Sequence, residues 1–333
     1  MYNIVSSNKF KQAIKSVLGQ SYRNIELLLV NDGSSDESQS ILEKMKTDDS
    51  RIKLITKPNG GVESARRAGL KIASGEYVFH MDQDDLLECH AIEKMVQCAE
   101  KNKADVVVGT SKRFIANKKF SKGEKRFSET IYLTHEEFMK QYYVGFFGIY
   151  KFPVQIWNKL YRKKFIDSIP EPPTTGLYNE DLNYNMHILP NANRIIWIPD
   201  VTYYYRWGAF TCKKIETLEE TALSCYRIKM KQIEKMNLWE FENSICIELL
   251  NYINSAIYQE IEYEDSVQES FEKYCERLFS FSEVQHAIEI VRKTDYRNRH
   301  IELMIQNDIS GLEKYERDIF AKNKIKRLLK RIF

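Results

Sequence analysis

The chain has 333 residues, of which 43% are hydrophobic and 29% are charged. This composition indicates a globular protein with a sizeable core and excludes a collagen-like or disordered chain. The net charge of +3 is too small to predict nucleic-acid binding. No apolar run approaches the ~18 residues of a membrane-spanning helix, and the N-terminus lacks the apolar run of a signal peptide. The six cysteines form no CxxC pair, so we expect free thiols in a reducing cytosol.

Hydrophobic periodicity predicts that helices and strands alternate in the first third of the chain. The expected elements are a helix over residues 9–18, a strand over 25–30, a helix through 41–45, a strand over 52–56, a helix over 64–73, a strand over 77–81, a helix over 92–99 and a strand over 105–110. Ser34 and Glu37 have the spacing of a capping box for the first inner helix. Such alternation is typical of a parallel sheet with helices on both faces.

The pattern changes in the second half of the chain. A loop or hairpin is expected over residues 111–130, and a helix opens at a capping box of Thr134 and Glu137. Extended segments are expected over 194–198 and 201–205, before long helical patterns over 215–236, 239–261, 267–279 and 284–291. The sequence therefore predicts an α/β domain over residues 1–213 and a helical region over residues 214–333.

Three carboxylates follow the predicted strand at residues 77–81. Asp82, Asp84 and Asp85 stand at its carboxyl end, where open α/β sheets bind their ligands. Clustered carboxylates repel one another unless a cation or a hydrogen-bond network neutralises them. These residues alone leave two interpretations open, a divalent metal site or a solvated acidic turn before a helix.

Seven segments, in this order, resemble the inverting nucleotide-sugar glycosyltransferases with a GT-A fold, glycosyltransferase family 2. They are residues 16–22, 29–36, 59–69, the Asp82-x-Asp84-Asp85 motif, Trp157-Asn158-Lys159-Leu160-Tyr161, Asn179-Glu180-Asp181 and Tyr203-Tyr204-Tyr205-Arg206. Each motif alone is weak, but seven in the family's order make chance improbable. The resemblance covers about residues 2–211. It implies a Rossmann-like, mostly parallel sheet with helices on both faces, followed by the α-helical C-terminal region.

The resemblance implies a donor site and a metal site. The donor is expected to be a UDP-sugar bound by Tyr2, Asn3, Asp32, Arg66, Asp82 and Arg206. Asp32 is expected at the nucleobase, and Asp84, with Asp82 beside it, is expected to hold Mg²⁺ or Mn²⁺ that bridges the two phosphates. Local alternatives are a turn role for Asp32, a surface salt bridge for Arg66 and a helix cap for Asp85.

The acceptor hydroxyl needs a general base, because a sugar hydroxyl is a poor nucleophile near neutral pH. By resemblance Asp181 is that base, and Glu180 orients the acceptor or the base. The alternative is that Asp181 and Glu180 are simply acidic residues in the first turn of a helix, where negative charge is favourable. Trp157 fits either a sugar face or the core. His80 reads as a core or crevice residue with its hydrogen bonds satisfied.

The family normally begins with a hydrophobic strand that ends in a Pro-x-Tyr-Asn-like turn, whereas Met1 directly precedes Tyr2 and Asn3 here. We therefore expect the first strand to be missing, which would remove about three buried aliphatic side chains at ~1.5–3 kcal/mol each. Either the sequence is N-terminally incomplete, or the chain is this short and the protein is impaired.

The last residues have the pattern of a basic amphipathic helix. Ile325, Leu328, Leu329, Ile332 and Phe333 share one face among lysines and arginines, which suits an anionic membrane surface. The alternatives are a helix docked on the domain or a frayed tail.

The resemblance thus implies a metal-dependent inverting glycosyltransferase for bacterial capsule, exopolysaccharide or teichoic acid synthesis. The expected acceptor is a saccharide or a lipid-linked saccharide, and the expected location is the cytoplasm, peripheral to the inner face of the cell membrane. One alternative is a non-catalytic or impaired nucleotide-sugar-binding remnant. A second, a nucleotidyltransferase, is disfavoured because no glycine-rich, basic phosphate loop stands near the N-terminus.

Overall fold

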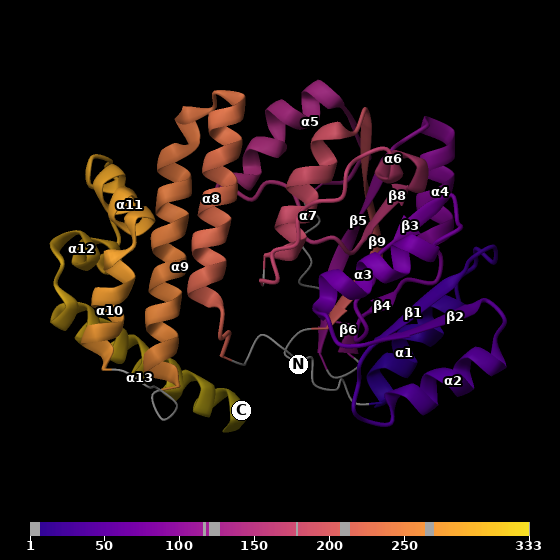
Figure 1. The fold of residues 1–333 in the computed structure, drawn as a ribbon, viewed down its shortest axis with the longest axis horizontal. Coiled ribbons are helices and arrows are strands. Elements are labelled where there is room, and N and C mark those ends of the chain that lie inside the picture. The colour runs from indigo at the N-terminus through magenta and orange to yellow at the C-terminus, as the bar shows by residue number, and fades with distance from the viewer. Residues whose placement is uncertain are drawn as a thin grey trace. The chain divides into compact units, whose positions relative to one another are not determined.

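A computed structural model describes residues 7–115, 118–119, 127–177, 179–206, 214–263 and 270–332. The side chains of residues 7, 8, 115, 118, 119 and 325–332 are outside this description. The chain divides into two compact units (Figure 1). Unit 1 comprises Met1–Tyr143, Val154–Gly176 and Glu180–Cys212, and unit 2 comprises Val144–Pro153, Leu177–Asn179 and Lys213–Phe333. Unit 2 thus includes two short segments that lie before the predicted boundary at Lys213.

The first part of unit 1 alternates as predicted. Its elements are α1 (Ser7–Leu18), β1 (Leu27–Asp32), α2 (Ser38–Asp48), β2 (Ile52–Lys57), α3 (Gly61–Ile72), β3 (Tyr77–Phe79), β4 (Leu86–Leu87), α4 (Ala91–Asn102) and β5 (Val106–Ile115). The prediction of a capping box between Ser34 and Glu37 is wrong. The Ser34 amide instead donates to Asn31 Oδ1 in the turn after β1, and Asp36 Oδ1 accepts from the Ser38 amide at the start of α2.

The remaining elements are β6 (Lys118–Lys119), β7 (Ile131–Thr134), α5 (His135–Gln141), η1 (Tyr143–Phe146), β8 (Lys159–Arg162), α6 (Lys163–Asp167), α7 (Glu180–Ile188), η2 (Leu189–Asn191) and β9 (Arg194–Arg206). The capping box at Thr134 is confirmed, since the Thr134 hydroxyl accepts from the Glu137 amide and the Glu137 carboxylate accepts from the Thr134 amide. The two predicted extended segments are one strand, β9.

The strands form two sheets. One is the parallel pair β1–β2, and the other has the order β3-β8-β5-β9-β4, with β6 on β5 and β7 on β9. The α/β class is confirmed, but the pairing of the described strands is mixed rather than mostly parallel. Among the described strands of the larger sheet, only β5 and β9 pair in parallel. One reason is that β8 enters between β3 and β5 in the opposite direction, and β4, β6 and β7 also pair antiparallel to their neighbours. The early strand–helix alternation cannot reveal these pairings.

Strands β1 and β3 each have one edge without a strand partner in the part of the chain that the structure describes. β1 pairs with β2 and β3 pairs with β8. The two strands begin close together, because Glu26 Oε1 accepts from the Gly75 amide at 2.8 Å. Residues 27–30 and 77–79 are only half-buried, whereas residues 106–108 of β5 are at most 1% exposed. The missing first strand stays a prediction. It would explain why the apolar strands β1 and β3 are only half-buried.

Helices cover both sheets of unit 1 (Figure 1). Phe10 and Ile14 of α1 pack with Ile52 against the β1–β2 pair, and α4 packs its buried Met95 on the larger sheet. The buried Gln20 side chain links α1 to α4, because it donates to the Glu88 carbonyl and accepts from the Ile92 amide. Gln20 therefore gives the motif over residues 16–22 a structural role.

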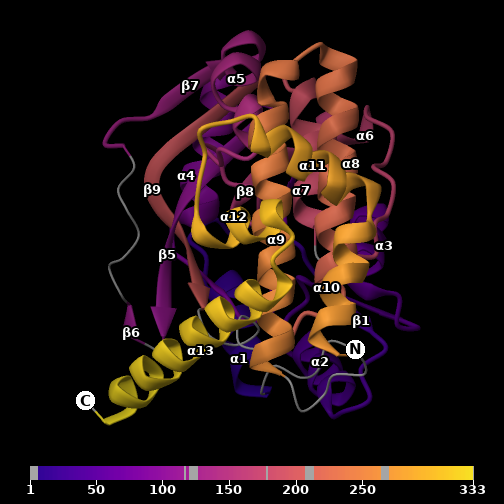
Figure 2. The same cartoon turned by 90° about the vertical axis from the view of Figure 1, so that its left-hand side faces the viewer.

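Unit 2 is helical, as predicted. Its elements are α8 (Leu218–Met236), η3 (Trp239–Phe241), α9 (Glu242–Glu262), α10 (Phe271–Ser280), α11 (Ser282–Arg292), α12 (Arg299–Gln306) and α13 (Ile309–Ile332). Figure 2 shows α8 and α9 side by side, and α9 also packs on α11. Between α8 and α9, the buried Lys229 ammonium contacts the Glu248 carboxylate at 2.5 Å. Among the described residues, no helix has the length and apolarity needed to cross a membrane.

Candidate active site

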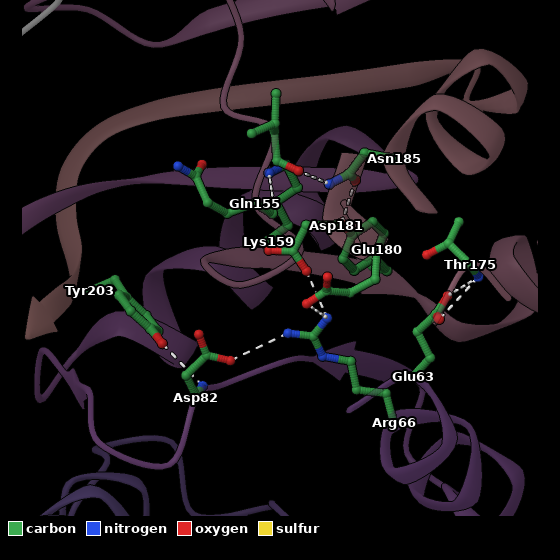
Figure 3. Close-up of polar contacts among 12 residues, drawn as sticks. Glu63, Arg66, Asp82, Gln155, Lys159, Thr175, Glu180, Asp181, Asn185 and Tyr203 are labelled. Atoms are coloured by element: carbon green, nitrogen blue, oxygen red, sulfur yellow. Dashed lines mark hydrogen bonds and ion pairs between the residues drawn. The ribbon is translucent and has the colours of Figure 1, made fainter. Parts of the chain in front are cut away.

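The Arg66 guanidinium, on α3, joins three carboxylates of unit 1 (Figure 3). Its Nη1 lies 2.6 Å from Asp181 Oδ1 and 3.9 Å from Glu180 Oε1, and its Nη2 lies 3.3 Å from Asp82 Oδ1. The Arg66 side chain is only 18% exposed, so this is no surface salt bridge. The fork of a guanidinium lets one cation bind two carboxylates at once. Arg66 therefore connects the predicted donor carboxylate to the predicted general base.

The carboxylates around Arg66 perturb one another. Burial, reinforced by the Asp181 charge, raises the pKa of Glu180 to about 7. Desolvation also raises the pKa of Asp82, while Arg66 opposes that shift. Burial would lower the pKa of Arg66, but the charges of Asp181, Asp82 and Glu180 raise it above its usual value. The guanidinium is thus a permanent cation within an acidic cluster.

Asp85 anchors the acidic loop to β9. Its side chain is fully buried and accepts hydrogen bonds from the Tyr203 hydroxyl at 2.7 Å and from the Arg206 amide at 2.6 Å. Burial raises the pKa of Asp85 to about 8, although both hydrogen bonds oppose the shift. The helix-cap alternative for Asp85 is wrong, because α4 begins only at Ala91.

Asp82 and Asp84 lie in the same loop in different surroundings. Asp84 is buried, with 8% of the residue exposed, whereas the side chain of Asp82 is 37% exposed. The described part of the chain holds no cluster of three His, Cys, Asp or Glu residues suited to a metal. Two hard carboxylate ligands fit a cation such as Mg²⁺ only if a bound molecule, for instance a diphosphate, supplies further oxygens.

Arg206 supports the acidic loop from β9. Its Nε donates to the Asp84 carbonyl at 2.7 Å, and its Nη2 donates to Gln12 Oε1 at 3.0 Å. The guanidinium lies 4.4 Å from the centre of the Phe114 ring, and the residue is 7% exposed. The predicted phosphate contact of Arg206 stays a prediction, because its guanidinium is bound to protein groups here.

Asp32 fixes the start of α3. Its carboxylate contacts Lys57 Nζ at 2.5 Å and accepts from the amides of Gly60 and Gly61 at 3.1 and 2.8 Å. Burial opposes the shift, but these hydrogen bonds lower the pKa of Asp32. A carboxylate at a helix N-terminus satisfies amides that lack intrahelical partners. Asp32 therefore positions the helix that carries Arg66, and its contact with a nucleobase stays a prediction.

Two predicted donor residues, Tyr2 and Asn3, lie outside the described residues.

Trp157 stacks on Tyr203 and Tyr205, with ring centres 4.6 and 5.5 Å apart and interplanar angles of 13° and 8°. This stacking supports the interpretation of Trp157 as a packing residue.

Two buried basic side chains, Lys159 and His80, were given no role in the site from the sequence. Lys159 is fully buried, and its Nζ donates to the Gln155 carbonyl. His80 Nε2 is buried without a hydrogen-bond partner among the described atoms. The prediction that the hydrogen bonds of His80 are satisfied is therefore wrong. Lys159 stands inside a quoted motif, Trp157-Asn158-Lys159-Leu160-Tyr161, which was the available signal for it.

The family model described as Glycosyl transferase family 2 matches residues 1–167. The chain belongs to glycosyl transferase family 2. Glycosyltransferase GlyG of Streptococcus pneumoniae serotype 4 is 26% identical over 287 residues, which are 82% of this chain and 92% of GlyG. The uncharacterized glycosyltransferase EpsJ of Bacillus subtilis is 29% identical over 224 residues, or 62% of this chain. The chain spans 59% of EpsJ and 29% of another relative, glycosyltransferase GlyA of S. pneumoniae.

A solved structure shares the fold of this family 2 chain. The crystal structure of residues 1–349 of S. aureus TarS in complex with UDP-GlcNAc superposes with a TM-score of 0.57 at 18% sequence identity. The superposition covers 95% of this chain and 89% of the TarS chain. The GT-A fold followed by a helical region is therefore confirmed.

Proposed function

We propose that this chain is a metal-dependent inverting glycosyltransferase that transfers a sugar from a UDP-sugar to an acceptor hydroxyl. The observation that carries the proposal is the Arg66 guanidinium, which contacts both Asp82 of the DxD motif and Asp181, the proposed base. The fold shared with TarS, whose crystal structure holds UDP-GlcNAc, supports the choice of donor.

On the donor side, Asp84 and Asp82 would hold Mg²⁺ or Mn²⁺ against the diphosphate. The bound cation would neutralise charge that builds on the departing UDP. The chain's own part is to hold the loop in place, since Asp85 binds β9 and Arg206 binds the Asp84 carbonyl. Arg66 holds a positive charge next to Asp82, where the donor is expected to lie.

On the acceptor side, Asp181 is the proposed general base. Its Oδ1 is bound to Arg66. Its Oδ2, which makes no hydrogen bond to the residues described, would accept the proton of the acceptor hydroxyl. The deprotonated oxygen then attacks the anomeric carbon from the side opposite the diphosphate, and the configuration inverts. A positioned base contributes ~10²–10⁴-fold to such a step.

The proposed setting is bacterial cell-surface polysaccharide synthesis, with a saccharide or a lipid-linked saccharide as acceptor. The protein would work in the cytoplasm, held at the inner face of the membrane by the basic segment over residues 322–333. The backbone of this segment continues α13 to Ile332, and its side chains from residue 325 lie outside the described residues.

The proposal is tested by incubating the protein with UDP-sugars, Mg²⁺ or Mn²⁺ and candidate acceptors, and by measuring UDP release and sugar transfer. Asp84→Ala should abolish transfer, and Asp181→Asn should slow it by ~10²–10⁴-fold. Asp200→Asn, which removes only a surface pair with Lys94, should not. UDP-sugar binding without turnover would favour the non-catalytic alternative, and pyrophosphate release would favour a nucleotidyltransferase.

A further inference from the structure

A proline-rich loop lies against two helices of unit 1. This loop, residues 170–176, contains Pro170, Pro172 and Pro173 and has no helix or strand of its own. Proline has a fixed φ and no amide hydrogen, so such a segment is stiff but makes few backbone hydrogen bonds. The position of the proline-rich loop then depends on side chains of other elements.

Glu63 of α3 binds the end of the proline-rich loop. Its carboxylate accepts hydrogen bonds from the Thr175 amide at 3.1 Å and from the Gly176 amide at 2.8 Å. Gly176 has a φ of +64°, a left-handed conformation that glycine adopts readily. Hydrogen bonds to an ionised acceptor are about twice as strong as neutral ones. Two successive amides of the loop are therefore fixed to one side chain of α3.

Two further side chains hold the middle of the proline-rich loop. On α3, Arg67 Nη2 donates to the carbonyl of Pro172, which is a buried residue. On α7, Asn183 Nδ2 donates to the Pro173 carbonyl at 2.7 Å. Arg67 also pairs with Glu171, but that carboxylate is 66% exposed, so the pair contributes little. The loop is thus held from α3 and from α7.

The face of α3 that holds the loop also carries Arg66. Glu63 precedes Arg66 by three positions, and helical residues at this spacing have Cβ atoms ~5–6 Å apart. Figure 3 shows Glu63 and Thr175 on the side of the Arg66 guanidinium away from Asp82. Burial is the main cause of the raised pKa of Glu180, and the Glu63 charge adds to it. The end of the loop therefore lies near Glu180.

We infer that Glu63 and Arg67 are positioning residues that hold the proline-rich loop as a wall of the acceptor site. This inference rests on the proposed function, because it takes Asp181 as the general base. A base must lie within hydrogen-bond reach of the hydroxyl that it deprotonates, so the acceptor saccharide binds beside Asp181. The loop ends four positions before Glu180, and its placement limits which saccharides fit there.

Loss of either side chain should weaken acceptor binding and leave donor binding alone. A charge-assisted hydrogen bond shifts the equilibrium between a held and a released loop by roughly tenfold. Because only the held loop forms the wall, the apparent affinity for the acceptor falls with the held fraction. Glu63→Ala and Arg67→Ala should each raise the KM for the acceptor by about tenfold, whereas the KM for the UDP-sugar should stay constant.

The first measurement is steady-state transfer from UDP-GlcNAc or UDP-glucose to a panel of p-nitrophenyl glycosides, with Mg²⁺ or Mn²⁺ present. Glu63→Gln keeps a side-chain oxygen that accepts an amide hydrogen, so it should recover part of the loss. Lys71→Ala is the matched control, because it removes an exposed charge from the same helix. This control should keep both KM values.

The second measurement is hydrogen–deuterium exchange of the proline-rich loop, followed by mass spectrometry. The three prolines of the loop carry no amide hydrogen, so two of its four amides are those bound to Glu63. Glu63→Ala should therefore speed exchange of this segment by about tenfold, whereas Lys71→Ala should not.

Equal rises of the two KM values in Glu63→Ala would overturn the inference, because a general loosening of the fold weakens both substrates alike. An unchanged acceptor KM in whichever alanine variant folds, or unchanged loop exchange, would overturn it too. Exchange does not depend on turnover. A wild-type protein that transfers no sugar, but whose loop exchanges faster in Glu63→Ala, would overturn the proposed function and support the loop-positioning role of Glu63.

Discussion

Glu180→Gln should change how the free energy of unfolding depends on pH. Burial and the Asp181 charge raise the pKa of Glu180 from 4.5 to about 7. The folded protein therefore binds this proton more tightly than the unfolded chain does. The resulting stability is fully present below pH 4.5 and is lost as the pH rises through 7. A shift of about 2.5 units at 1.36 kcal/mol per unit sets an upper limit of about 3 kcal/mol.

Urea unfolding of the wild type and of Glu180→Gln between pH 5 and 8.5 measures this effect, and urea leaves ionic interactions unscreened. Glutamine resembles the protonated glutamate, so the two proteins should be about equally stable at pH 5. At pH 8 the variant should be more stable by about 1–3 kcal/mol. A stability difference that does not vary with pH would refute the reasoning.

Glu26→Gln is the control of opposite sign. Burial opposes the shift, but hydrogen bonds from Lys53, Ser74 and Gly75 lower the pKa of Glu26 to about 2. The stability that Glu26 contributes is therefore present above its unfolded pKa and is lost as the pH falls. Glu26→Gln should be less stable than the wild type at neutral pH and approach it in acid.

Four further predictions concern the base, the helical unit and the two ends of the chain. Asp181→Asn should lower kcat by ~10²–10⁴-fold with little change in the KM for the donor. A smaller loss in steady-state kinetics would contradict the role of Asp181 as general base. Lys229→Met should cost ~3–5 kcal/mol in urea unfolding, because it removes the cation that pairs with the Glu248 carboxylate and leaves that group only the Tyr150 hydroxyl. Adding Glu248→Leu should recover most of that loss, and equal costs of the single and double variants would contradict this. An upstream extension by one strand length should raise the melting temperature and strengthen donor binding, and equal values would dismiss the missing strand. Deleting residues 322–333 should reduce co-sedimentation with anionic liposomes, and unchanged partitioning would exclude the membrane contact.

Local patterns predicted much of the fold. The apolar runs at residues 25–30 and 105–110 lie in β1 and β5. The Thr134 capping box was predictable because its two partners are only three positions apart in the chain. The join between residues 194–198 and 201–205 was not predictable, because Pro199 interrupts the apolar pattern. The strand continues through it with register shifts in the β5–β9 pairing.

The candidate site was predicted in part. The motifs identified Arg66, Asp82 and Asp181 as site residues. They did not show that one guanidinium joins both carboxylates, although Asp181 lies 115 positions from Arg66 in the chain. The burial of Lys159 was likewise hidden, because it depends on β8 lying between β3 and β5. Such contacts depend on tertiary packing, which local periodicity does not encode.

The unpaired edges of β1 and β3, within the part of the chain described, have a consequence for the protein in solution. Rows of amide and carbonyl groups beside half-buried apolar side chains are a template for another extended chain. An extended segment laid along either edge would be held by strand hydrogen bonds. The strand that precedes Asp82 is one of the two, so such pairing and the order of the acidic loop would change together.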